Sequence, residues 1–103
     1  MKHYIFAKLN FTEFDWIKSY QENVPDIIEQ AGGKILARTH KTEVSEGSCD
    51  QPHVILLVEF PSKKSADDFY TSEEYRPYLE ARLAGSVSEI HSFAGEDSVG
   101  TSS

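Results

Sequence analysis

The chain has 103 residues, of which 39% are hydrophobic and 12% aromatic, so it can form one domain with a core and is too apolar for disorder. Its 10 Lys and Arg against 17 Asp and Glu give a net charge of −7, which argues against a nucleic-acid partner. The single cysteine, Cys49, excludes an internal disulfide and a Cys-x-x-Cys site, and we interpret it as an incidental loop residue.

The first part of the chain alternates between strand and helix patterns. Residues 3–11, HYIFAKLNF, are rich in aromatic and branched side chains and predict a strand. Thr12 is the expected N-cap of a helix. Pro25 is expected to kink or interrupt this helix, and Gly32-Gly33 to end it. Residues 34–44 then predict a second strand.

The second part repeats the alternation after a polar loop, in which Glu46-Gly47 favours a hairpin turn over a site. Residues 53–60, HVILLVEF, are the most apolar strand and are expected at the centre of a sheet. Ser62 and Ser72 are expected N-caps of two helical pieces, the second ending at Gly85. Residues 86–94 predict the last strand.

This order, βαββαβ with the second helix in two pieces, predicts a ferredoxin-like α+β fold. The expected antiparallel sheet has strand order 4-1-3-2 and both helices on one face. Residues 1–95 form the predicted single domain, and residues 96–103 a flexible C-terminal tail with little apolar surface. No run of about 18 apolar residues predicts a membrane span, and the start shows no cleavage signal, so we expect a cytoplasmic protein.

The sheet face without helices carries an unusual mixture of side chains. Strict alternation predicts that it holds Tyr4, Phe6, Lys8, Leu36, Arg38, His40, His53, Ile55, Leu57, Glu59, Glu89, His91 and Phe93. So large an apolar patch favours burial against a second copy in a two-fold homodimer. Arg38 and His40 then face the space between two sheets, as part of an interface network or as the lining of a pocket.

Several motifs resemble the DUF1330 family, within the dimeric α+β barrel superfamily. They are AGGKILAR, the SEG of the loop, VEFPS, and ADDFYTSEEYRPYLEAR, and the resemblance covers roughly residues 3–95. The family implies a ferredoxin-like protomer and a homodimer, and it implies no activity. Cofactor-free monooxygenases, haem-degrading enzymes and lactone isomerases occur in the superfamily, so the fold alone does not fix the function.

On the family's pattern, the positions to examine are Arg38, Glu46, Glu59, Tyr70, Ser72, Tyr75 and Arg82. The chain departs from the pattern at Ala31, where an aromatic is common, and at Thr39-His40, where small residues are common. Arg38 and Glu59 can form a structural ion pair, or Arg38 can hold a carboxylate or enolate. Tyr70, Tyr75 and Arg82 can pack helix on sheet or form the rim of a pocket.

The histidines leave two alternatives open. His40, His53 and His91 can share one face, and a metal site there lacks the usual His-x-His spacing, so no metal is predicted. His40 or His91 is the candidate general base, because histidine titrates near neutral pH. No Gly-rich phosphate loop, Cys-x-x-Cys pair or nucleotide motif is present in the sequence.

The resulting hypothesis is a homodimer that binds a small anionic or aromatic molecule through Arg38, Glu59, Tyr70, Tyr75 and Arg82, or a purely structural dimer. No cofactor is expected. The alternative is a cofactor-free enzyme, resembling a monooxygenase or an isomerase, acting on a small organic acid or aromatic. In that case Arg38 holds the anion and His40 or His91 moves a proton.

Overall fold

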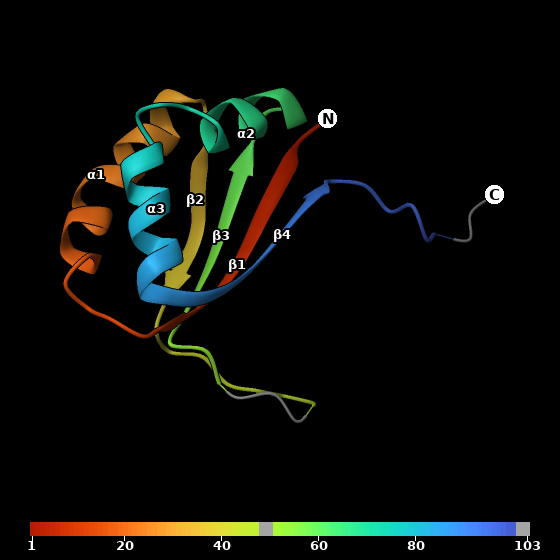
Figure 1. Ribbon diagram of the computed structural model, residues 1–103. Helices are drawn as coiled ribbons and strands as arrows, with labels where there is room; N and C mark the ends of the chain where they lie inside the picture. The colour runs from red at the N-terminus through yellow and green to blue at the C-terminus, as the bar shows by residue number, and fades with distance from the viewer. Residues whose placement is uncertain (48–50, 101–103) are drawn as a thin grey trace.

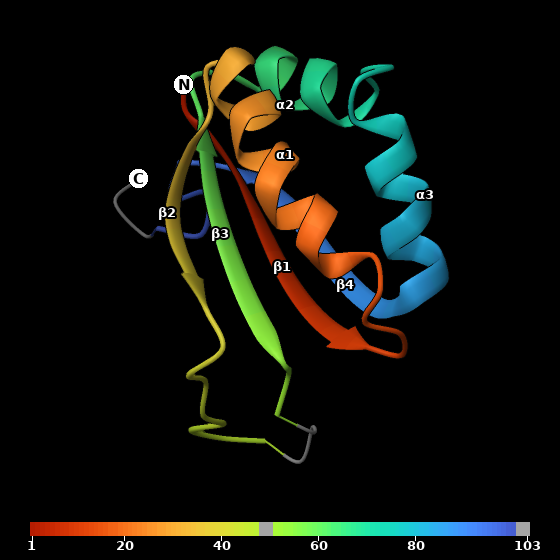
Figure 2. The same ribbon diagram turned by 90° about the vertical axis from the view of Figure 1, so that its left-hand side faces the viewer.

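The computed structural model of the protein describes residues 1–47 and 51–100, which form an antiparallel sheet with three helices on one of its faces (Figures 1 and 2). The elements follow in the order β1 (His3–Phe11), α1 (Ile17–Gln30), β2 (Lys34–Thr39), β3 (Val54–Phe60), α2 (Lys63–Tyr70), α3 (Arg76–Gly85) and β4 (Ser86–Ala94). The strand order β2-β3-β1-β4 confirms the predicted ferredoxin-like sheet.

The core lies between the sheet and the helices. On β1, alternate residues from His3 to Leu9 are buried beneath the helices, as alternation predicts. Their cross-strand partners on β3 include Val58 and Phe60, and Phe60 is fully buried. Helices α1 and α2 complete the core with Val24, Ile28, Ala66 and Phe69.

Strand β2 departs from simple alternation. Ile35 lies opposite Val58, but the next pair is Ala37 with Leu57, so Leu36 is an extra residue in a β-bulge. The bulge places Ala37 on the helix-free face with Leu57, and Arg38 opposite Leu56 on the helix-covered face. The prediction that Arg38 shares the helix-free face was therefore wrong.

Helix α1 begins later than the sequence predicted, and it continues through Pro25. Its N-cap is Trp16, whose side chain makes no capping bond, so the expected cap at Thr12 was wrong. Pro25 lies inside the helix without interrupting it. The helix ends as predicted, because Gly32 adopts φ +87° and the N–H groups of Gly32 and Gly33 donate to Glu29 and Ile28.

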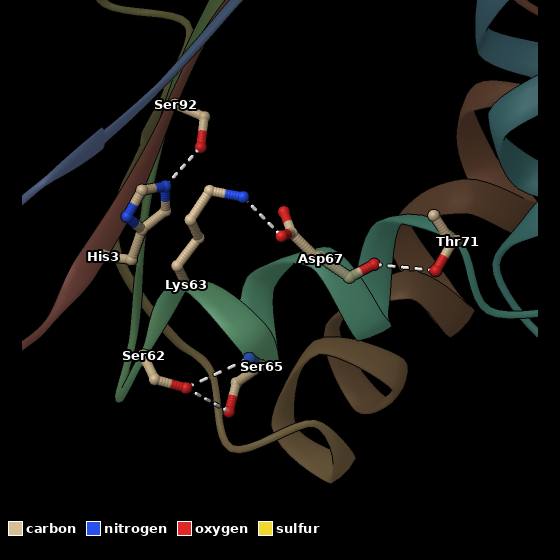
Figure 3. Close-up of polar contacts among 7 residues, drawn as sticks. All are labelled: His3, Ser62, Lys63, Ser65, Asp67, Thr71 and Ser92. Atoms are coloured by element: carbon tan, nitrogen blue, oxygen red, sulfur yellow. Dashed lines mark hydrogen bonds and ion pairs between the residues drawn. The ribbon is translucent and has the colours of Figure 1, made fainter.

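The short helices use serine caps. The Ser62 hydroxyl accepts a hydrogen bond from the Ser65 N–H at 3.1 Å, which confirms the predicted cap of α2 (Figure 3). Ser72 caps the turn before α3 instead of the helix itself, accepting from the Tyr75 N–H at 3.2 Å. Figure 3 also shows buried His3 from β1 joined to Ser92 of β4 at 2.6 Å.

Two predictions concern Cys49 and the C-terminal tail. Cys49 lies outside the described residues, and so does the end of the predicted flexible tail, residues 101–103. The remainder of the tail is exposed. Over the described ranges, 1–47 and 51–100, no helix combines the length and apolar character needed to cross a membrane.

Candidate functional site

A cavity of about 350 Å³ lies between α1 and the β1, β2 and β3 strands. Helix α1 forms one wall of the cavity, and the sheet forms the opposite wall. Most of the lining is apolar or aromatic: Leu9, Phe11, Trp16, Ile17, Tyr20, Val24, Pro25, Ile28, Ile35, Val54 and Leu56. Cavities with this character suit the apolar body of a small organic molecule.

Polar side chains occupy one end of this cavity, next to the edge strand. Arg38 near the end of β2, His40 just after it and Gln21 on α1 line the cavity and are also exposed. The cavity therefore reaches solvent at this end. The β-bulge at Leu36 is the cause of the arrangement, because it turns Arg38 toward the helix-covered side of the sheet.

Arg38 does not form the predicted pair with Glu59. Glu59 lies on the other face of the sheet and forms an ion pair with Lys2, whose Nζ atom is 2.8 Å from the Glu59 Oε1 atom. The hydrogen bond to Glu59 and its negative charge raise the pKa of Lys2. Among the described residues, Arg38 makes no salt bridge and no side-chain hydrogen bond. Its guanidinium is thus available to a ligand.

Trp16 is a wall residue that the sequence reasoning missed. Its indole N–H donates to the Glu13 carbonyl at 2.8 Å and to the Gly85 carbonyl at 3.1 Å. Its ring packs edge-on against Phe11 and Tyr20, with centroids 5.6 and 5.4 Å away. Aromatic residues four positions apart at 16 and 20 were the available sequence signal, since this spacing places them on one side of a helix.

Tyr20 separates the cavity from a second group of polar side chains. Its ring lines the cavity, and its hydroxyl lies 2.7 Å from the Tyr75 hydroxyl. Burial raises the pKa of the Tyr20 phenol, and the neighbouring Tyr75 raises it further. Tyr20 is consequently a neutral hydrogen-bonding group at all physiological pH values.

The raised pKa of Tyr20 predicts a loss of stability in alkali. Above a pH of about 10 the phenol ionises in the unfolded chain but stays protonated in the folded one, so stability falls as pH rises. We expect Tyr20→Phe to flatten this fall in urea unfolding curves measured across that range. The exposed Tyr70 offers a matched control, and an equal flattening by Tyr70→Phe would contradict the assignment to Tyr20.

The predicted site residues of the helical region lie behind this tyrosine and do not line the cavity. Tyr75 is 3% exposed and Arg82 2%, whereas Tyr70 is exposed at the surface. The ring centroids of Tyr70 and Tyr75 are 6.1 Å apart, and those of Phe69 and Tyr75 are 4.4 Å apart. Tyr75 thus packs in the core, in agreement with the first of the two predicted alternatives, the packing of helix on sheet. Arg82 is buried beside it.

The predicted histidines do not gather in one place. His91 lies opposite Phe6 on the helix-free face and is exposed, whereas His40 lines the cavity. The Nδ1 atom of His53 accepts a hydrogen bond from the Phe11 N–H at 2.8 Å. Within residues 1–47 and 51–100, no three His, Cys, Asp or Glu side chains are placed to hold a metal ion. Glu46 is exposed beside Gly47, whose φ is +108°.

Comparisons with known proteins identify a family and a fold. The family model described as "Domain of unknown function (DUF1330)" matches residues 2–95. No functionally curated protein matches the sequence. Among solved structures, a protein of unknown function, RPA0582 from Rhodopseudomonas palustris, has a TM-score of 0.78 at 13% identity, over 93% of this chain and 83% of that one.

A second similar structure is SnoaB from Streptomyces nogalater, described as a cofactor-independent oxygenase. Its TM-score is 0.68 at 11% identity, over 95% of this chain and 96% of that one. A Bacteroides thetaiotaomicron protein of unknown function, described as a possible oxidoreductase, has a TM-score of 0.55 at 11% identity, over 89% and 93% of the two chains. At these identities the likeness shows the fold alone.

Proposed function

Because this chain belongs to the DUF1330 family, whose function is unknown, we propose its role from its own geometry: it is a homodimer that binds a small aromatic carboxylate in the cavity beside α1. The observation that carries this proposal is the combination of aromatic walls with a free guanidinium at the open end. An aromatic body packs against Phe11 and Trp16, and its carboxylate receives two N–H donors from Arg38.

The proposal is tested with a pair of ligands that differ only in charge. Naphthoate and its neutral amide, naphthamide, present the same bicyclic body. Trp16, the chain's single tryptophan, lines the cavity and reports binding by a change of fluorescence. We expect saturable binding of naphthoate, about tenfold tighter than naphthamide. Equal binding of both would remove the role of Arg38, and binding of neither would contradict the proposed ligand class.

The helix-free face supports the homodimer. The three helices of the described chain cover the other face (Figure 2). The bare face carries a stacked Tyr4–Phe93 pair with centroids 5.6 Å apart, and Phe93 is 47% exposed. Its charges are largely balanced, since Lys2 pairs with Glu59 and Lys8 with Glu89 at 2.8 and 3.5 Å. Two such faces do not repel each other, and their pairing removes apolar surface from water.

A charge at the centre of this face is predicted to break the dimer. Leu57 lies between Phe6 and Ala37 on neighbouring strands, so Leu57→Asp places a carboxylate inside the interface. We expect the mass from light scattering to change from that of a dimer to that of a monomer. Leu83→Asp on α3 is the matched control, because Leu83 is 62% exposed on the helical side. A monomeric wild type, or a dimeric Leu57→Asp variant, contradicts the proposal.

A second candidate function is a cofactor-free reaction in the same cavity, and the presence of His40 beside Arg38 in the lining favours it. With a carboxylate held by Arg38, His40 removes a proton from the adjacent carbon and later returns one. SnoaB, whose fold is similar, is described as a cofactor-independent oxygenase, so this fold is compatible with a reaction that needs no cofactor.

Proton transfer of this kind can be measured as hydrogen–deuterium exchange, without conversion of the ligand to a product. In D2O, exchange at the methylene carbon of naphthylacetate is followed by proton NMR. His40→Gln is expected to abolish any protein-dependent exchange, while His91→Gln on the opposite face leaves it unchanged. Exchange at the rate of buffer alone would restrict the protein to binding.

A further inference from the structure

Arg82 is a buried cation for which the described residues provide no counterion. It lies on α3 and is 2% exposed, the most buried charged side chain of those described. The four ion pairs among the described residues are Lys2–Glu59, Lys8–Glu89, Lys63–Asp67 and Lys64–Asp68, and none includes Arg82. Its Nε and Nη2 atoms also have no hydrogen-bond partner there. Two buried donors of one guanidinium are therefore unsatisfied.

The groups around Arg82 are tyrosines, not carboxylates. Burial lowers the pKa of its guanidinium, but the oxygens of Tyr75, Tyr20 and Tyr70 outweigh that effect and the pKa is raised, so Arg82 stays charged. Tyr20 stays neutral because burial raises its pKa. The positive charge is thus not balanced by a tyrosinate at position 20.

The two phenols leave a donor to spare. The hydroxyls of Tyr20 and Tyr75, 2.7 Å apart, share one hydrogen bond, which uses one of their two protons. The other proton can turn toward a neighbour. Together with Nε and Nη2 of Arg82, the cluster presents three donors and a full positive charge in a place shielded from water. The tyrosine oxygens favour the charged form of Arg82, but they leave its Nε and Nη2 groups without hydrogen-bond partners among the described residues, and a buried donor without a partner is unfavourable.

We propose that Arg82, Tyr20 and Tyr75 form a buried site for a small monovalent anion, either a halide or a simple carboxylate such as formate. The site goes beyond the proposed ligand cavity, because Tyr75 and Arg82 do not line that cavity. Its ligand is small, since Arg82 is only 2% exposed. The anion satisfies the two free guanidinium donors and neutralises the charge between the helices.

The first test is thermal unfolding at constant ionic strength with bromide or formate replacing sulfate. A ligand of the folded state raises the midpoint, by about 5 °C or more for each tenfold rise above its Kd. We expect this rise for the wild type and for Arg76→Met, which removes an exposed arginine from the same helix. Arg82→Met is expected to lose it. An equal response of all three proteins, or no response of the wild type, overturns the proposal.

The second measurement uses only the wild-type protein, so it does not depend on the folding of Arg82→Met. Wild-type crystals soaked in bromide are expected to show an anomalous peak within hydrogen-bonding distance of the Arg82 guanidinium and the Tyr75 hydroxyl. A response to formate without a bromide peak assigns the site to carboxylates. Water alone beside Arg82 in crystals from both salts overturns the proposal. Naphthoate binding tests the separate cavity beside α1, so its outcome does not decide whether an anion binds at Arg82.

Discussion

Replacing Arg38 by methionine is expected to weaken naphthoate binding by about tenfold and to leave naphthamide binding unchanged. The guanidinium lines the open end of the cavity and makes no ion pair with any described residue, so its loss removes a charge-assisted hydrogen bond to the ligand and little else. The effect is moderate because Arg38 is exposed and water screens its charge. Titration followed by Trp16 fluorescence measures it.

Lys34→Met is the matched control for this variant. Lys34 lies on the same edge strand, and its replacement by methionine removes the same positive charge as Arg38→Met does. However, the cross-strand partner of Lys34 is Glu59, on the helix-free face of the sheet. We expect it to bind naphthoate as the wild type does. If both variants weaken binding equally, the ligand responds to net charge and not to a guanidinium in the cavity. Arg38→Lys separates the two effects further, because it keeps the charge and loses the two-pronged geometry.

Gly85→Ala is expected to lower the free energy of unfolding by about 2–4 kcal/mol and to impair the cavity at the same time. A Cβ atom at this position would collide with the indole nitrogen and the Cδ1 atom of Trp16. The Gly85 carbonyl also accepts hydrogen bonds from the N–H groups of Thr12 and Glu13, at 2.9 and 3.0 Å. Trp16 must therefore leave its place, and the cavity loses an aromatic wall. Urea unfolding followed by circular dichroism measures the stability.

A double-mutant cycle with Trp16→Phe checks the cause. The phenylalanine ring has no atom in the place of the indole nitrogen but keeps a carbon in the place of Cδ1, so part of the collision is relieved and Gly85→Ala should cost less in this background than in the wild type. An equal cost in both backgrounds would show that the loss comes from the backbone around Gly85. The collision with Trp16 would then be the wrong explanation.

The sheet was largely predictable from sequence because β1, β3 and β4 alternate regularly. The predicted strands 3–11 and 86–94 coincide with β1 and β4, and the most apolar run became central strand β3. Apolar side chains at every second position fix which face is buried, and a slip by one residue would expose them all. The Gly32–Gly33 terminus of α1 was equally readable, since a left-handed residue there favours glycine.

The candidate site was less predictable because it depends on irregularities. No residue type in β2 signals the β-bulge at Leu36, yet the bulge moves Arg38 from one face of the sheet to the other. Alternation therefore paired Arg38 with Glu59, which in fact holds Lys2. The start of α1 was also misplaced: Thr12 was a plausible cap, but its N–H donates to Gly85, and this contact between distant segments decides the path of the chain.

A crystal structure of the protein with naphthoate tests the central claim most directly, because it shows which face of the sheet receives the ligand. The account predicts the carboxylate beside the Arg38 guanidinium and the rings between Trp16 and the β2–β3 edge. Ligand density between two helix-free sheet faces, next to His91 and Phe6, would contradict it. Such a result would place the functional site inside the proposed dimer interface.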